Sequence, residues 1–238
     1  MYFAIKNSLF VVTIGIIIAT FLATLLLYIK SYLPQKLKIV LEFFVTLPLF
    51  LPPSVTGYFL LLVFGVQGVI GKFLFEICNI RVTFSLYGAI ISGIVVSLPI
   101  VYQSINLAIS SIEKEYIEEA ILMGTNHFQM FRYIVFPMSK NGIIAGIILG
   151  MGRILGEFGA TLMVAGNIPH KTQTIPTAIY SAVESGNDKE AMILILIAVW
   201  ISSIIMWLYS LLKRKELKNQ KNYPSYICLL YTSPSPRD

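Results

Sequence analysis

Residues 118–137 read EEAILMGTNHFQMFRYIVFP, the one polar segment with helical periodicity between long apolar runs. Apolar side chains recur there at helical spacing, at Ile117, Ile121, Leu122 and Phe128. This spacing predicts a short amphipathic helix, a turn at Gly124 to Asn126, and a second amphipathic piece that Pro137 ends. The segment is either an ordinary loop between membrane spans or a docking helix that offers the carboxylates of Glu118 and Glu119 to a soluble partner.

The composition is that of an integral membrane protein. Of 238 residues, 56% are hydrophobic and 13% are charged, whereas a soluble domain carries about 25% charged residues. The net charge of +6 is expected from basic cytoplasmic loops, and no basic stripe interleaved with aromatic side chains indicates nucleic-acid binding. Cys78 and Cys228 form no disulfide framework, and His127 and His170 lie in separate loops, so we expect no metal site.

Five apolar stretches are long enough to cross a bilayer. They are residues 9–29, 39–64, 84–109, 141–165 and 190–212. A signal peptide is disfavoured for the first, because the apolar run is too long and no small-residue cleavage site follows it. We expect an amphipathic surface helix at residues 65–83 and a polar loop at residues 166–189. We therefore expect an all-α integral membrane protein with about five transmembrane helices.

Prolines and glycines mark two of these spans. Pro48, Pro52 and Pro53 interrupt the second span, and the carbonyl groups that they free need protein or water nearby. That span should face the bundle interior or a pathway, or be a kinked structural helix. The fourth span has a glycine-rich face suited to close helix packing, made of Gly142, Gly146, Gly150, Gly152, Gly156 and Gly159.

The fourth span also carries two charges, Arg153 and Glu157. Charges are costly inside a membrane and usually face the protein interior or a water-filled path. At i, i+4 the two side chains can share one helix face and partly neutralise each other. The pair either fixes helix packing or belongs to the pathway or its gate. Our pathway or gate candidates are Arg153, Glu157, Thr161, Pro52 and Pro53.

The distribution of Lys and Arg predicts the orientation. With five spans, the segments on the side of residues 118–137 hold eleven Lys and Arg, and those on the opposite side hold five. The positive-inside rule therefore places the N-terminus outside, and the docking segment and the C-terminus in the cytoplasm.

The spacing within residues 118–137 resembles the EAA loop of ABC-importer permeases, Glu-Ala-Ala-x3-Gly-x9-Ile-x-Leu-Pro. The matching residues are Glu118, Ala120, Gly124, Ile134 and Pro137. The chain departs from the motif at two positions, with Glu119 at the first Ala and Phe136 at the Leu. The resemblance implies a type I importer permease bundle in which these residues form a coupling helix that sits in a cleft of a separate ATPase subunit.

A second string, RILGEFGATLMVAGNIPHKTQTIPTAIYSAVESG at residues 153–186, resembles the molybdate-importer permeases, as does LPPSVTGY at residues 51–58. Sulfate and thiosulfate permeases share a related element, but they typically have Tyr at the position of Phe158 and lack the continuation at residues 172–176. The resemblance favours molybdate over sulfate, with tungstate as a substrate that could share the pathway.

The family resemblance also implies partners. It implies a homodimer in the bacterial cytoplasmic membrane, two ATPase subunits beneath it, and a periplasmic or lipid-anchored molybdate-binding protein above it. The chain has no G-x-x-x-x-G-K-[ST] loop, so it does not bind ATP by that route, and we expect no cofactor on it and no enzymatic activity of its own.

We place the permease domain at residues 1–215 and a cytoplasmic tail at 216–227. Residues 228–238, CLLYTSPSPRD, break abruptly from the Lys- and Asn-rich tail. They look like the in-frame translation of a transposase sequencing adapter, and we leave them out of the fold reasoning.

Two other classes of protein compete with the importer. A stand-alone ion-coupled carrier would use an acid inside the membrane, for which we identify Glu157, but the two halves of the chain show no repeat. A membrane enzyme would need paired acids, a metal cluster or a nucleophile with its base, and Glu157 with Arg153 does not supply one.

Overall fold

The computed structural model of the chain describes residues 1–221, with side chains as far as residue 214. Every regular element in this range is a helix. Three helices are each long and apolar enough to cross a membrane, namely α1 (Tyr2–Tyr32), α5 (Leu86–Ser110) and α12 (Asp188–Lys221). Two bent pairs of helices raise the number to five if each pair is one span. The all-α bundle of about five spans is confirmed.

The second span is not a single helix. It consists of α2 (Gln35–Phe50) and α3 (Pro53–Phe64), which meet at an angle of 118°. The residue before a proline is disfavoured in the helical region, and Leu51 is accordingly extended, with ψ at 142°. Pro53 then occupies the first helical position of α3, where its missing N–H costs nothing. The paired prolines therefore divide the span.

The fourth span also differs from the expectation. We predicted one continuous glycine-rich span over residues 141–165, but α9 (Lys140–Leu155) ends before Gly156, and α10 (Gly159–Ala165) begins after Phe158. The second bent pair of helices consists of α9 and the helical segment before it, His127–Met138, which meet at an angle of 67°. That segment contains α7 (His127–Met130), η1 (Phe131–Val135) and α8 (Phe136–Met138).

The segments between the spans carry helices of their own. The predicted surface helix within residues 65–83 is α4 (Val69–Cys78). Residues 166–189 are not only a polar loop, because they include α11 (Ile175–Glu184). A capping box between Thr174 and Thr177, with Pro176 at the helix start, begins this helix. The first part of the docking segment is α6 (Lys114–Leu122).

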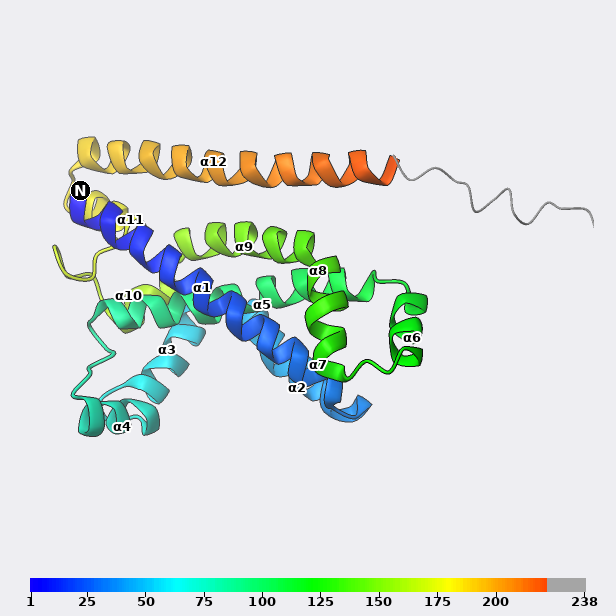
Figure 1. Cartoon of the computed structure of the whole chain (residues 1–238). Helices are drawn as coiled ribbons and strands as arrows, with labels where there is room; N and C mark the ends of the chain where they lie inside the picture. Colours follow the sequence, from blue (N-terminus) through cyan, green and yellow to red (C-terminus); the bar gives the residue numbers. More distant parts are fainter. Residues whose placement is uncertain (222–238) are drawn as a thin grey trace, which may run out of the picture.

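The core lies where α1, α5 and α9 pack against one another. Figure 1 shows α1 crossing the other two helices and α12 running along the outside of α9. Buried aliphatic and aromatic side chains fill the seam, among them Val11, Ile16, Val101, Tyr102, Ile105 and Ile154. The docking helices α6 and α7 lie at one end of the bundle, and α4 with the loop before α11 lies at the other (Figure 1).

Part of the predicted glycine face is the seam between α9 and α5. A Cβ on Gly142 would overlap the Cβ of Ala108 and come within 3.0 Å of the carbonyl oxygen of Ser104. The hydroxyl of Ser104 donates to the carbonyl of Gly142 at 3.0 Å, which holds the two backbones together. Gly152, in contrast, faces α12, and a Cβ there would meet only Ile205, at 3.8 Å.

Gly142→Ala should therefore destabilise the bundle by about 1–3 kcal/mol, because α5 and α9 must move apart. Gly152→Ala is the matched control in the same helix. It should be neutral or stabilising, since alanine favours a helix over glycine by about 1 kcal/mol. Thermal unfolding of both variants in detergent measures the difference. Equal melting temperatures would contradict the close α5–α9 seam.

The described part of the chain ends with α12, which runs to Lys221 and so extends past the boundary that we placed at residue 215. The remainder of the tail and the predicted adapter segment at residues 228–238 lie outside the described residues.

Candidate functional site

The turn between α6 and α7 is closed by its own backbone. The carbonyl of Ala120 accepts from both the N–H of Thr125, at 3.1 Å, and its hydroxyl, at 2.7 Å. Gly124 lies inside this loop with φ at +78° and donates its N–H to Ile121 at 2.9 Å. Nothing lies within 4 Å of a Cβ placed on Gly124, so this position requires glycine for its backbone conformation and not for space.

The start of α7 has a cap that our sequence reasoning missed. Asn126 accepts the N–H of Gln129 at 2.8 Å, and Gln129 accepts the N–H of Asn126 at 3.0 Å. This is a reciprocal capping box, which satisfies two backbone donors at the helix start. The Asn-x-x-Gln spacing directly after Gly124 could have revealed it. Turn and cap together fix the direction in which α7 leaves α6.

The docking segment turns its apolar side chains outward. Leu122 is 87% exposed and Met123 is 81% exposed, and Ile121 and Phe128 are also exposed. Glu118 and Glu119 are exposed beside them, whereas Ala120 is buried at 3%. Of the apolar face that we predicted, Ile121 and Leu122 are therefore exposed, whereas Ile117 is half-buried and Phe128 lies against Tyr28. Exposed apolar side chains beside carboxylates are the kind of surface that a docking helix would present to a partner.

Aromatic contacts attach the second half of the segment to the C-terminal end of α1. The ring of Tyr28 lies 6.4 Å from that of Phe128 and 5.1 Å from that of Phe131, and the ring of Tyr32 lies 5.1 Å from that of His127. A displacement of α7 therefore acts on α1 directly.

Pro137 does not end the helix, contrary to our prediction. It lies in α8, the helix continues through Met138, and the chain bends at Ser139. Pro137 has no N–H for the carbonyl four residues earlier, and its ring crowds that carbonyl. The backbone accommodates it by widening into the π-helix η1 immediately before, which contains the half-buried Ile134. The bend of the helix axis therefore lies at Ser139, two residues beyond the proline.

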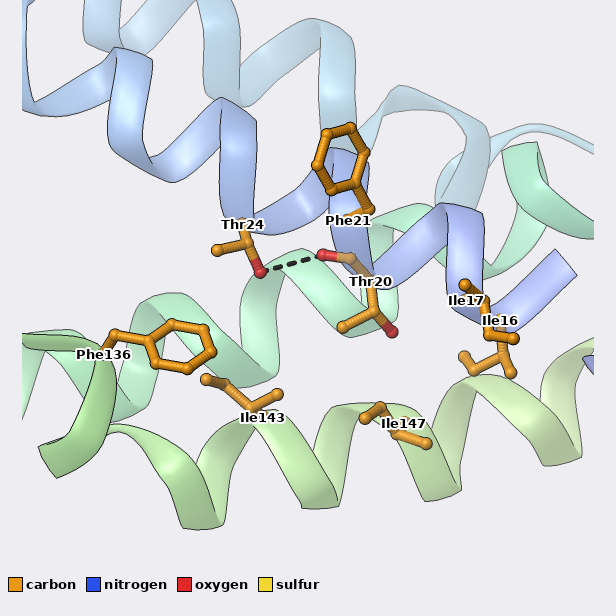
Figure 2. A pocket seen from close by; sticks show the side chains of 8 residues that line it. All are labelled: Ile16, Ile17, Thr20, Phe21, Thr24, Phe136, Ile143 and Ile147. Carbon is orange, nitrogen blue, oxygen red and sulfur yellow. Dashed lines mark hydrogen bonds between the residues drawn. The ribbon is translucent and has the colours of Figure 1, made fainter. Parts of the chain in front are cut away.

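An apolar groove of about 400 Å³ runs between α1 and the α8–α9 segment (Figure 2). Its walls are Ile16, Ile17, Thr20, Phe21, Thr24, Phe136, Ile143 and Ile147. The hydroxyl of Thr24 donates to the carbonyl of Thr20 at 2.9 Å, so this polar group is satisfied within α1. Phe136, which replaces the motif leucine, fills one end of the groove (Figure 2). The groove is therefore a place where the docking segment packs against the bundle, and it is not a polar binding site.

Arg153 and Glu157 meet at the break between α9 and α10. Nη1 of Arg153 lies 2.6 Å from Oε2 of Glu157, whose side chain is 2% exposed. The other carboxylate oxygen accepts the N–H of Ala160 at 2.8 Å, in the first turn of α10. Both oxygens are thus engaged within the protein. This geometry supports a structural role, in which Glu157 neutralises Arg153 and holds the two helix pieces in line.

The other pathway candidates lie where α3 packs on α10. Thr161 is buried at 3%. A Cβ on Gly159 would come within 2.8 Å of Pro53, which sets the close approach of the two helices. Pro52 and Pro53 are exposed. The structure therefore brings Pro53 close to the segment that contains Thr161, and it leaves Pro52 at the surface of the α2–α3 bend.

A polar cluster that we did not predict joins α1, α2 and α5. Lys30 pairs with Glu42 and donates to Oδ1 of Asn106 at 3.0 Å. A pocket of about 360 Å³ beside it is lined by Glu42, Thr46, Tyr102, Gln103, Asn106 and Leu107. Tyr102 is 1% exposed, and its hydroxyl has no partner among the described residues. The lone acid in the apolar stretch 39–64 was the sequence signal for this cluster.

Glu42→Gln should lower stability by about 1 kcal/mol, because Lys30 loses its charge partner while both side chains are still partly reached by solvent. Glu76→Gln is the control. The ion pair between Glu76 and Lys72 is 3.9 Å long and mostly exposed, so the Glu76→Gln substitution should change stability by less than about 0.5 kcal/mol. Melting temperatures in detergent compare the two. An equal response would show that the cluster does not hold α1 to α2.

Comparison with known proteins agrees with this architecture. The sequence profile described as "Binding-protein-dependent transport system inner membrane component" matches residues 8–218. A molybdenum transport system permease protein of Haemophilus influenzae is 35% identical over 90% of this chain and 91% of its own length. That of Escherichia coli K12 is 35% identical over 70% of this chain and 78% of its own. A sulfate transport system permease protein of Synechocystis is 29% identical, over 74% and 62%.

Solved structures share the fold. A chain of a bacterial alginate ABC transporter, crystallised in complex with a periplasmic protein bound to an alginate pentasaccharide, superposes with a TM-score of 0.71. The two chains are 20% identical, and the match covers 90% of this chain and 78% of that one. The profile match spans most of the helical bundle, including both the docking segment and the α9–α10 break. The chain therefore belongs to the family of binding-protein-dependent transport system inner membrane components, and it is a membrane permease.

Proposed function

We propose that this chain is the permease subunit of an ATP-driven importer that carries molybdate into the cytoplasm. The observation that carries the importer proposal is the outward-facing docking segment, with Leu122, Met123 and two glutamates exposed at one end of the bundle. The names of the Haemophilus influenzae and Escherichia coli relatives support molybdate as the substrate. Tungstate, which has the same shape and charge, should share the path.

The transporter would be a homodimer of this chain with two ATPase subunits and a binding protein. ATP would be hydrolysed on the ATPases, and this chain would bind no cofactor. In this arrangement α6 and α7 lie in the cytoplasm and the N-terminus lies outside, as the excess of Lys and Arg on the docking side supports. Glu118 and Glu119 would contact basic groups of the ATPase. Leu122 and Met123 would fill an apolar cleft between those basic groups.

The contacts of the docking segment suggest how its movement reaches the pathway. When the ATPases close, α7 would press on Tyr28 through Phe131, whose ring lies 5.1 Å away. The π-helix η1 and the bend at Ser139 would then transmit the shift to α9. Since α1, α5 and α9 share one packed core, they would move together and change which side of the membrane the pathway faces.

Uptake of labelled molybdate into proteoliposomes tests this function. The vesicles would hold this permease with its ATPase, and the binding protein would be added outside. We expect uptake that requires ATP, resists a tenfold excess of sulfate, and is reduced by tungstate.

Sulfate is the second candidate substrate, supported by the Synechocystis relative at 29% identity. Uptake that a sulfate excess abolishes would assign the chain to the sulfate permeases. Uptake by this subunit without ATP would contradict the importer and favour a stand-alone carrier.

A further inference from the structure

The loop after α4 and the loop before α11 lie at the end of the bundle opposite the docking segment (Figure 1). Residues from both loops line a small pocket. Its volume is about 350 Å³. Six residues line it, namely Val66, Arg81, Thr83, Phe84, Ser85 and Lys171. Two of the six are cations from segments ninety residues apart in the sequence, and none of the six is acidic.

Neither cation of this pocket, Arg81 or Lys171, takes part in an ion pair within the described residues. The neighbouring helix α4 carries one acid, Glu76, which pairs with Lys72 at 3.9 Å. Two like charges lining one cavity repel each other, and the arrangement becomes favourable when an anion lies between them.

The loops that carry the cations are held in place. The carbonyl of Lys171 accepts the side-chain amide of Asn7, which is 6% exposed, at 3.3 Å. The next residue, Thr172, is fully buried and accepts the N–H of Ile168 at 3.1 Å. The guanidinium of Arg81 lies over the ring of Phe75, 4.9 Å from its centroid. The backbone at Lys171 is therefore anchored, and the Arg81 side chain lies against α4.

The wall between the two cations is also fixed. Phe84 has φ at 54°, which is uncommon for a side chain of its size, and its N–H donates to the carbonyl of Val164 at 2.9 Å. A Cβ on Gly166 would lie 3.1 Å from the Phe84 ring, so the two loops touch here. Strained backbone of this kind persists only where the surrounding structure enforces it.

The first turn of α5 adds to the positive potential of the pocket. Ser85 precedes this 25-residue helix, but its hydroxyl donates to the carbonyl of Val82 at 2.7 Å and does not cap the first turn. The positive end of the helix dipole thus stays open beside Arg81 and Lys171. Thr83 supplies a further hydroxyl at the wall.

We propose that this pocket is an anion-receiving site at the outer mouth of the permease, which takes a tetrahedral oxyanion before it enters the pathway. The proposal rests on the function proposed above and assigns Arg81 and Lys171 as its binding residues. A doubly charged oxyanion has only hydrogen-bond acceptors, and the pocket offers a guanidinium, an ammonium and a hydroxyl. Its acid-free lining distinguishes it from the pocket beside Glu42 and from the Arg153–Glu157 pair.

Equilibrium binding of labelled molybdate to the complex of permease and ATPase in nanodiscs, without binding protein, tests the site. We expect saturable binding by the wild type. The double variant Arg81→Gln/Lys171→Gln should bind at least about tenfold more weakly, because it loses two charge-assisted contacts. The conservative variant Lys171→Arg should keep most of the binding. Since Arg81 and Lys171 are exposed, the variants should fold as the wild type does.

The matched control is Lys72→Gln/Lys189→Gln, which removes the same charge from exposed positions outside the pocket. It should bind molybdate as the wild type does. An equal loss in the control would show a diffuse surface potential rather than a site and would overturn the proposal. Wild-type binding that is absent, or unchanged in the pocket variant, would also overturn it. So would a pocket variant that weakens only the docking of the binding protein.

Wild-type uptake in proteoliposomes separates this proposal from the function on which it rests. If the wild type takes up molybdate and the pocket variant binds and transports it equally well, the anion site is wrong and the function stands. If the wild type takes up no molybdate but the pocket still binds it in a way that depends on Arg81 and Lys171, the proposed substrate is wrong and the site stands.

Discussion

Glu157→Leu is expected to destabilise the protein by about 3 kcal/mol or more. The variant leaves Arg153 without its partner at 2.6 Å, and it removes the acceptor for the N–H of Ala160 at the start of α10. Removing one member of a buried ion pair costs about 3–5 kcal/mol, and the 30% exposure of the Arg153 side chain places the expected value at the lower end. Thermal unfolding in detergent measures it.

The double variant Arg153→Met/Glu157→Leu is the control for this structural role. Replacing both charges with apolar side chains leaves no uncompensated charge, so it should restore a large part of the stability that Glu157→Leu loses. If the double variant recovers stability but transport is lost, the pair also acts in the pathway. If the double variant is less stable than Glu157→Leu alone, the account of a compensated pair is wrong.

Gly124→Pro should abolish the coupling of ATP hydrolysis to transport while the protein still inserts into the membrane. Proline cannot adopt the φ of +78° found there, and it removes the N–H that Gly124 donates to Ile121. The turn must then rearrange, and α7 can no longer leave α6 in the direction set by the Asn126 cap. The measurement is ATPase activity and molybdate uptake in the same proteoliposomes, where hydrolysis should persist without uptake.

Gly186→Pro provides a matched control for Gly124→Pro. Gly186 also has a positive φ, +72°, no atom within 4 Å of a Cβ, and an N–H donated three residues back, to Val183. The local backbone strain is therefore similar, but the turn lies before α12 and away from the docking segment (Figure 1). Coupling should persist in this variant. Equal loss in both would mean that the turn at Gly124 has no special role.

Glu118→Lys tests the surface of the docking segment rather than its backbone. The side chain is exposed and lies outside the core, so stability should stay within about 0.5 kcal/mol of the wild type. Reversing its charge should nonetheless reduce the affinity of the ATPase, since a carboxylate that met a basic group would become a cation. Wild-type ATPase binding and uptake would contradict the role of this glutamate.

The sequence pattern predicted which stretches form helices, but it predicted the positions of the helix breaks less well. Apolar length alone located α1, α5 and α12, because a membrane span needs a long apolar run whatever its packing. The break at Gly156–Phe158 was not predicted, although its contacts are local in sequence, because Glu157 pairs with Arg153 four residues earlier and accepts the N–H of Ala160 three residues later.

Candidate residues were likewise predicted where the signal is local in the sequence and missed where it comes from several helices. The helical periodicity of the docking segment located the turn at Gly124, because glycine is itself the residue type that permits the backbone conformation found there. The cluster of Lys30, Glu42 and Asn106 was not predicted, because its members come from three helices, although Glu42 is the one acid in the apolar stretch 39–64. The pocket of Arg81 and Lys171 escaped notice for the same reason, although both cations were assigned to the outer segments.

Cysteine labelling of the docking segment tests the central claim most directly. A Leu122→Cys variant in a Cys228→Ser background would be treated with a membrane-impermeant maleimide in inverted vesicles, with and without the ATPase. Exposed Cys78, at the opposite end of the bundle, is an internal control. We expect Cys at 122 to react in inverted vesicles, to be protected by the ATPase, and Cys78 to react only in right-side-out vesicles. Reaction at 122 that the ATPase does not alter, or that occurs only from the outside, would contradict a cytoplasmic docking segment.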